Sequence, residues 1–205
     1  MRGKGGDISI EAKDVSVRES GSISADTGSL ADAGNITIRA TDFVEVSGEK
    51  PAGDDRRFPS SLRTTVSNPD AVGKAGNLVI ETGRFSITDG AQVLSATFGK
   101  GDAGDITIRA TDLVNLTGAS PVTARVSSLS TSVGEQAIGK GGDLTIETKK
   151  LQVDRGAQIF TSTLGNGNSG NFTVRASDAV VVSGVSVVDA TASGLFASAE
   201  AGAVG

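Results

Sequence analysis

The chain has 205 residues, 28 of them glycine, a net charge of −5 and no His, Cys, Trp or Tyr. The missing His and Cys exclude disulfides, thiolate or imidazole metal sites, and Ser-His or Cys-His nucleophiles. No basic patch is interleaved with aromatic residues and no apolar run approaches the roughly 20 residues of a membrane helix, so we expect neither nucleic-acid binding nor a membrane span. Because aromatic residues make up only 3% of the chain, any core must be thin and aliphatic.

A seven-residue motif occurs six times and opens six successive repeat units. It reads Gly, Asp or Asn, an apolar residue, any residue, an aliphatic residue, a charged residue, and Ala or Thr. The copies begin at Gly6, Gly34, Gly76, Gly104, Gly142 and Gly170. Their spacings of 28, 42, 28, 38 and 28 residues alternate between short and long. We therefore predict one repeat array over residues 1–205, built of two-unit supra-repeats at about 6–75, 76–141 and 142–205.

Each unit contains three apolar runs in chain order. The motif itself alternates apolar and polar residues, which is the period of a half-buried strand. A second run begins nine residues after each leading Gly, at Val15, Phe43, Phe85, Leu113, Leu151 and Ala179. A third run follows the next Gly and is clearest at residues 91–98 and 157–164. Three short strands per unit predict an all-β solenoid of about six coils, and the longer second run of the long units favours a bulge or register shift there.

The charged position of the motif alternates strictly in sign along the chain. It reads Glu11, Arg39, Glu81, Arg109, Glu147 and Arg175. If the units stack in parallel and in register, equivalent residues lie about 4.8 Å apart, and alternation places each Glu beside an Arg. Each such pair adds only about 0.2–1 kcal/mol, but a slip of one unit would put Glu on Glu. This structural ladder therefore predicts parallel, in-register stacking.

Two apolar columns and one polar column accompany the charged one. The apolar columns run from Ile8 to Phe172 and from Ile10 to Val174, and each residue would be buried only by its neighbours in the stack. The polar column is expected to cap the turn before each strand, and it comprises Asp7, Asn35, Asn77, Asp105, Asp143 and Asn171. Asp105 and Asp143 would be stacked like charges, and we expect solvent screening rather than a bound cation to offset their repulsion.

The two ends of the chain match internal turns. The first residues up to Asp7 resemble those leading to Asp143, and the last three resemble residues 137–139. No apolar segment follows Met1, so a secretory signal is not expected in this chain. We therefore expect a fragment of a longer array, cut inside one inter-unit turn at each end.

Two motifs carry a resemblance to a known family. They are G-(N/D)-(I/L)-T-I-(R/E)-A-T-D and D-G-A-Q-V-x-(S/T)-x-T-F-G, the second of which is carried by residues 89–99 and, with Arg155 inserted, by residues 154–165. In these motifs the chain is similar over its whole length to the central repeat region of filamentous-haemagglutinin-like exoproteins of the two-partner secretion family, some of which are S-layer-like.

The resemblance implies a right-handed parallel β-helix, export through an outer-membrane two-partner-secretion transporter, and display or adhesion at the bacterial cell surface, with a host-surface or glycan ligand. The family's amino-terminal secretion domain, which engages the transporter, has no counterpart in these 205 residues.

Candidate sites are few. Residues 134–140 match the opening of a phosphate-binding loop, but Gly141 replaces the Ser or Thr that would hold magnesium and a strand follows. The long units carry insertions at residues 49–60 and, less so, 119–125. Loops projecting from a rigid rod are common binding sites, so Arg56, Arg57 and Phe58 are the predicted partner contact. We expect no catalytic, cofactor-binding or metal residues.

Two functions remain after this step. The first is a structural, adhesive rod without catalysis, and the second is a carbohydrate-active β-helix of the polysaccharide lyase or hydrolase kind. Three or more carboxylates with an Arg or Lys in one groove would favour the enzyme. A face of Ser, Thr and charge ladders would favour the rod.

Overall fold

The computed structural model describes residues 3–48 and 58–199. These residues form β-strands and turns, with no helix and therefore no helix that could cross a membrane. The strands are β1 (Gly3–Lys4), β2 (Ile8–Arg18), β3 (Ser22–Ser24), β4 (Ala31–Asp32), β5 (Ile36–Ser47), β6 (Ser61–Val66), β7 (Leu78–Thr88), β8 (Gln92–Thr97), β9 (Ile106–Thr117), β10 (Ser128–Val133), β11 (Leu144–Asp154), β12 (Gln158–Thr163), β13 (Phe172–Ser183) and β14 (Gly194–Ala199).

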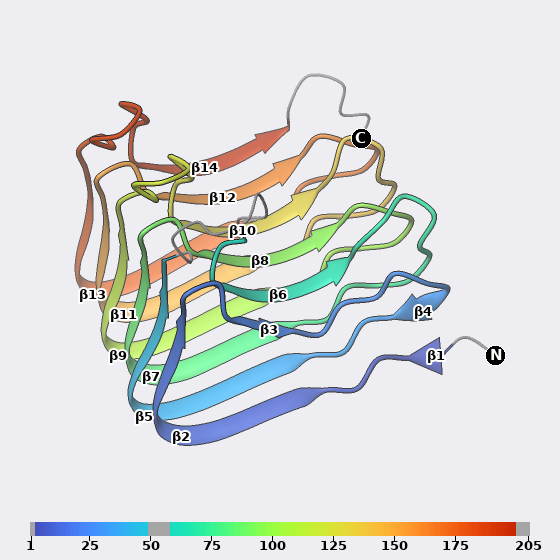
Figure 1. The fold of residues 1–205 in the computed structure, drawn as a ribbon, viewed down its shortest axis with the longest axis horizontal. Coiled ribbons are helices and arrows are strands. Elements are labelled where there is room, and N and C mark those ends of the chain that lie inside the picture. Colours follow the sequence, from blue (N-terminus) through green and yellow to red (C-terminus); the bar gives the residue numbers. More distant parts are fainter. Residues whose placement is uncertain (1–2, 49–57, 200–205) are drawn as a thin grey trace.

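Every repeat unit contributes one strand to each of two parallel sheets. The first sheet has the order β2-β5-β7-β9-β11-β13 and the second the order β3-β6-β8-β10-β12-β14. Figure 1 shows the two sets of strands running side by side, with the sequence colours rising through each stack. Residues paired across strands are the equivalent positions of neighbouring units, as in Glu11 with Arg39 and Glu147 with Arg175. The predicted all-β, parallel, in-register architecture is confirmed.

The number of strands per unit differs from the prediction of three. The first and second apolar runs form one continuous strand of 11 residues in the short units and 12 in the long units. In the first short unit, Lys13 and Asp14 separate the two runs, and both residues stay extended within β2. The extra residue of the long units sits in a register shift, where Ala40 and Phe43 face Ala12 and Asp14. The predicted irregularity is therefore confirmed as a bulge.

The segment between the second and first sheets is mostly not in regular strands. There β1 pairs with β4, and further along the stack Val72, Lys100, Ile138 and Asn166 are linked by isolated parallel bridges. Each of these units thus closes its turn with one bridging residue rather than with a third strand.

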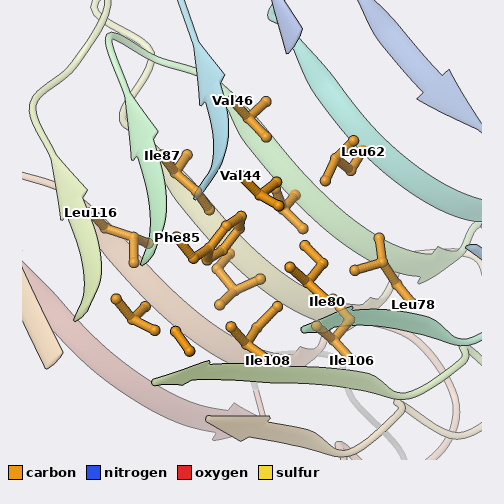
Figure 2. Close-up of a cluster of buried hydrophobic side chains, with 14 of the residues drawn as sticks. Val44, Val46, Leu62, Leu78, Ile80, Phe85, Ile87, Ile106, Ile108 and Leu116 are labelled. Atoms are coloured by element: carbon orange, nitrogen blue, oxygen red, sulfur yellow. The ribbon is translucent and has the colours of Figure 1, made fainter. Parts of the chain in front are cut away.

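The core lies between the two sheets and consists almost wholly of aliphatic side chains. Figure 2 shows Val44 and Ile80 of the first sheet facing the same interior as Leu62 of the second, with Phe85 as the one large ring among the labelled residues. All four are at most 1% exposed. Since every unit supplies its own layer of such residues, a thin core without Trp or Tyr is filled by repetition.

The leading glycines are required by the closeness of the stack. A Cβ added at Gly34, Gly76, Gly104, Gly142 or Gly170 would overlap the carbonyl oxygen of the preceding unit's leading glycine. Gly6, in the first unit, would meet nothing within 4 Å. The motif therefore begins with Gly because two backbones touch there.

Candidate functional site

The predicted Glu/Arg ladder runs along the outer face of the first sheet. Arg39 Nε lies 2.9 Å from Glu81 Oε2, and Arg109 reaches Glu81 at 3.4 Å and Glu147 at 3.1 Å. The outer members pair more loosely, with 3.9 Å between Arg39 and Glu11 and 3.5 Å between Arg175 and Glu147. Every Arg of the ladder is thus paired with a Glu of a neighbouring unit. The side chains are 38–76% exposed, so the ion pairs add little to the free energy of unfolding. Their main effect is to disfavour a stack shifted by one unit.

Two further columns of alternating charge flank the first, and the sequence prediction missed both. At the bulge, Lys13 lies 3.4 Å from Asp42 and Lys149 lies 2.9 Å from Asp112. The Asp112 carboxylate raises the pKa of Lys149 by its hydrogen bond and its charge. Between the sheets, Lys4 lies beside Asp32 in the backbone pairing of β1 with β4, while its ammonium is 3.4 Å from Asp7. In the same column Lys74 lies 3.5 Å from Asp102.

Taken together, the three columns give the two kinds of unit opposite charge patterns. With each unit opening at its leading glycine, short units carry Glu, then Lys or Gly83, and then Asp or Asn168, whereas long units carry Arg, then Asp, and then Lys74 or Lys140. A short unit is therefore electrostatically matched to a long one on both of its sides. Alternation of this kind requires two kinds of unit, in agreement with a repeat of two units rather than one.

The Asx column binds successive units to each other. Asp7 Oδ1 accepts the backbone N–H of Asn35 at 2.8 Å, and Asp143 Oδ1 accepts that of Asn171 at 2.7 Å. The same bond occurs at every intermediate step. The prediction that each side chain caps its own turn is corrected, because the donor belongs to the next unit. The bond from Asn35 is the main cause that lowers the pKa of Asp7.

Two shallow grooves lie beside the Glu/Arg ladder at the bulge. One, of about 480 Å³, is lined by Glu11, Arg39 and Glu81, and the other, of about 430 Å³, by Glu81, Arg109 and Glu147. Ala and Thr residues line both grooves. Each groove contains two carboxylates, and all of them belong to the ion pairs of the ladder.

A larger groove, of about 820 Å³, crosses the outer face of the second sheet over β3, β6 and β8. We call it the sheet-face groove. Its lining includes polar and aromatic side chains from four consecutive units, namely Ser20, Ser22, Asp26, Phe58, Pro59, Ser61, Arg63, Thr65, Ser67, Gln92, Leu94, Phe98 and Arg125. Phe58 and Pro59 belong to the first long-unit insertion and Arg125 to the second, so both insertions contribute to this groove.

The sheet-face groove contains a fixed ion pair and a guanidinium with one unpartnered nitrogen. Asp26 accepts hydrogen bonds from the backbone N–H and hydroxyl of Thr65, at 2.9 and 2.8 Å, and pairs with Arg63 Nε at 2.8 Å. Its carboxylate is therefore fully engaged. Arg125, in contrast, has a buried Nη1 atom without a hydrogen-bond partner.

The predicted partner contact is placed only in part. Arg56 and Arg57 lie outside the described residues. Phe58 is 62% exposed and lines the sheet-face groove. The prediction missed Arg125 and Phe98, although the first ends the smaller insertion and the second lies near the end of the D-G-A-Q motif.

Carboxylates are sparse in these three grooves. Neither groove at the bulge has more than two carboxylates among its lining residues, and the sheet-face groove has one. Over residues 3–48 and 58–199, no group of three or more Asp or Glu side chains is close enough to hold a metal ion. The described residues carry charge ladders along the first sheet and Ser and Thr side chains on the outer face of the second.

Comparison with known proteins identified no relative of this chain. No family model matches the chain, and no curated protein and no solved structure matches it either.

Proposed function

We propose that this chain is a non-catalytic rod segment of a longer, secreted bacterial surface protein of the filamentous-haemagglutinin-like, two-partner secretion kind. The fold proposed for it is a right-handed parallel β-helix of six coils, one for each repeat unit. The observation that carries the proposal is the alternating charge in three columns, which matches each unit to a neighbour of the other kind.

Physical features of the stack support a role as a spacer. Units bind their neighbours through strand pairing, Asx side chains and ion pairs, so added units extend the stack without changing its cross-section. The carboxylates in the grooves are held in ion pairs or hydrogen bonds, which leaves none poised as a general acid or base. The full protein would be exported through an outer-membrane transporter, displayed at the cell surface, and meet a host surface or a glycan there.

Small-angle scattering tests the rod. Duplicating residues 76–141 in the chain should add two coils, and hence about 10 Å at about 4.8 Å per coil, to the longest dimension while the cross-section stays constant. The control is the wild-type chain measured at the same concentrations. A duplicated chain whose cross-section grows instead would contradict the proposal.

Secretion and catalysis are tested separately. Fused behind a two-partner secretion domain and expressed with its transporter, the chain should reach the cell surface and become sensitive to added protease. Retention in the periplasm would count against the family. Incubation with acidic and neutral polysaccharides should release no reducing ends and no unsaturated sugars, and release of either would show an enzyme.

A further inference from the structure

The sheet-face groove differs from the rest of the rod because its charged residues are not repeated. At the position of Arg63 in the stack, the other long units have Ser130 and Phe196. Arg125 comes directly before Val126, which bridges to Ala119. In the last unit the equivalent bridge joins Val185 and Ala192, so Thr191 occupies the position of Arg125. The ladders recur in every unit because they hold the stack together. The sheet-face groove occurs once and is formed with residues of both insertions, so it is not needed for stacking.

The chemistry of the groove has three components. Phe58 and Phe98 are 62% and 42% exposed, and the lining also includes Gln92 and the hydrogen-bonded hydroxyls of Ser22 and Ser61. Arg125 supplies the cation. A buried guanidinium N–H without a partner is costly, and a turn of this flexible side chain towards an anion would satisfy it.

The place of the Phe98 ring is set by the next unit. A Cβ added at Gly134 would meet that ring at 2.8 Å, so the glycine leaves the room that the ring occupies. The ring is therefore held at the edge of the groove with part of its face open to solvent.

The strands under the groove favour a sugar over a peptide. β6 and β8 are each paired on both sides, so an extended peptide lying on them finds no free backbone edge. Apolar ring faces with hydroxyl and amide groups suit the C–H faces and hydroxyls of a glycan instead. The groove's volume of about 820 Å³ lies in the range of small-ligand sites.

We propose that the sheet-face groove binds an acidic glycan, with a carboxylate or sulfate of one sugar on Arg125 and neighbouring sugars against Phe98 and Phe58. This rests on the proposed surface role, for which it names the class of ligand. Arg63, held by Asp26, stays in place as a hydrogen-bond donor at the groove floor.

Titration calorimetry with a uronic-acid hexasaccharide tests the proposal, with a neutral glucan hexamer and a hexaglutamate peptide as comparison probes. The uronate should bind, and Arg125→Gln should weaken it about tenfold or more, because a charge-assisted hydrogen bond is lost. Phe98→Ala should weaken it roughly fivefold through the lost ring contact. Arg84→Gln, which removes the same charge from β7 of the other sheet, should bind as the wild type does.

Three outcomes overturn the proposal: no binding of the uronate, equal binding of the neutral hexamer, or tighter binding of hexaglutamate. Chemical-shift mapping on the wild-type chain keeps the test independent of how the variants fold. The uronate should shift the side-chain amide of Gln92 and leave Gln152 unmoved, and shifts confined to other surfaces would refute the site. If the uronate does not bind but scattering shows a rod, the glycan site is refuted and the proposed rod function is not. If scattering shows that the chain is not a rod, the proposed function is refuted whatever the binding result.

Discussion

Reversing one charge in the centre of the Glu/Arg ladder measures what that ladder contributes. In the variant Arg109→Glu, the ion pairs at 3.4 Å to Glu81 and 3.1 Å to Glu147 are lost and two like-charge contacts replace them. These side chains are 38–51% exposed, and each of the four changes is worth about 0.2–1 kcal/mol. The expected loss is therefore roughly 1–4 kcal/mol. For a domain of about 200 residues this lowers Tm by roughly 2–4 °C per kcal/mol.

Thermal melts followed by far-UV circular dichroism provide the measurement, and three comparisons make it specific. Arg175→Glu removes only the 3.5 Å pair with Glu147 and should cost about half as much. The effect of Arg109→Glu should shrink between about 0.01 and 1 M salt, as the Debye length falls from about 30 to 3 Å. Inverting all six ladder charges restores alternation and should return Tm close to that of the wild type. If the sixfold inversion is as damaging as the single reversal, the ladder acts through something other than alternating charge.

Three further predictions concern the contacts between units. Gly104→Ala should destabilise the stack severely or prevent folding, because its Cβ overlaps the carbonyl of Gly76, whereas Gly6→Ala should be tolerated, and equal denaturation midpoints would contradict this. Asp143→Ala should lower Tm more than Asp143→Asn, which keeps an oxygen for the N–H of the next unit, and the reverse order in thermal melts would refute that role. The pKa of Asp7 is lowered, so its stabilising contribution is present above pH 3.8 and lost as the pH falls through the lower folded value. An NMR titration midpoint at or above 3.8 would contradict this.

The stacking could be predicted from the sequence because residues that are neighbours in the stack occupy equivalent positions of the repeat. Once Glu11 and Arg39 occupy equivalent motif positions, parallel pairing brings them together whatever the loops between them do. The count of strands could not be predicted in the same way. Whether the chain turns or stays extended at Lys13 depends on how the bulge fits against the next unit, which is not visible in one unit alone.

The sheet-face groove lies beyond this kind of inference. Its aromatic and cationic residues come from different units and from insertions of unequal length, so no shared spacing connects Phe98 with Arg125. The insertion ending at Arg125 was visible in the sequence as a surface loop. That its side chain would return over the second sheet depends on the turn at residues 119–126, where Ser120 N–H donates to the Arg125 carbonyl at 2.8 Å.

The charge patterns of the units also explain how such a site can exist without weakening the rod. Register is held by the leading glycines, the Asx column and the three charge columns, all on the first sheet or between the sheets. The outer face of the second sheet carries none of these, and its core-facing residues, such as Leu62 and Val93, are buried beneath it. Outward positions there are free to differ from unit to unit at little cost in stability. The face on which the repeats diverge is therefore the face on which a ligand site can be built into a rod.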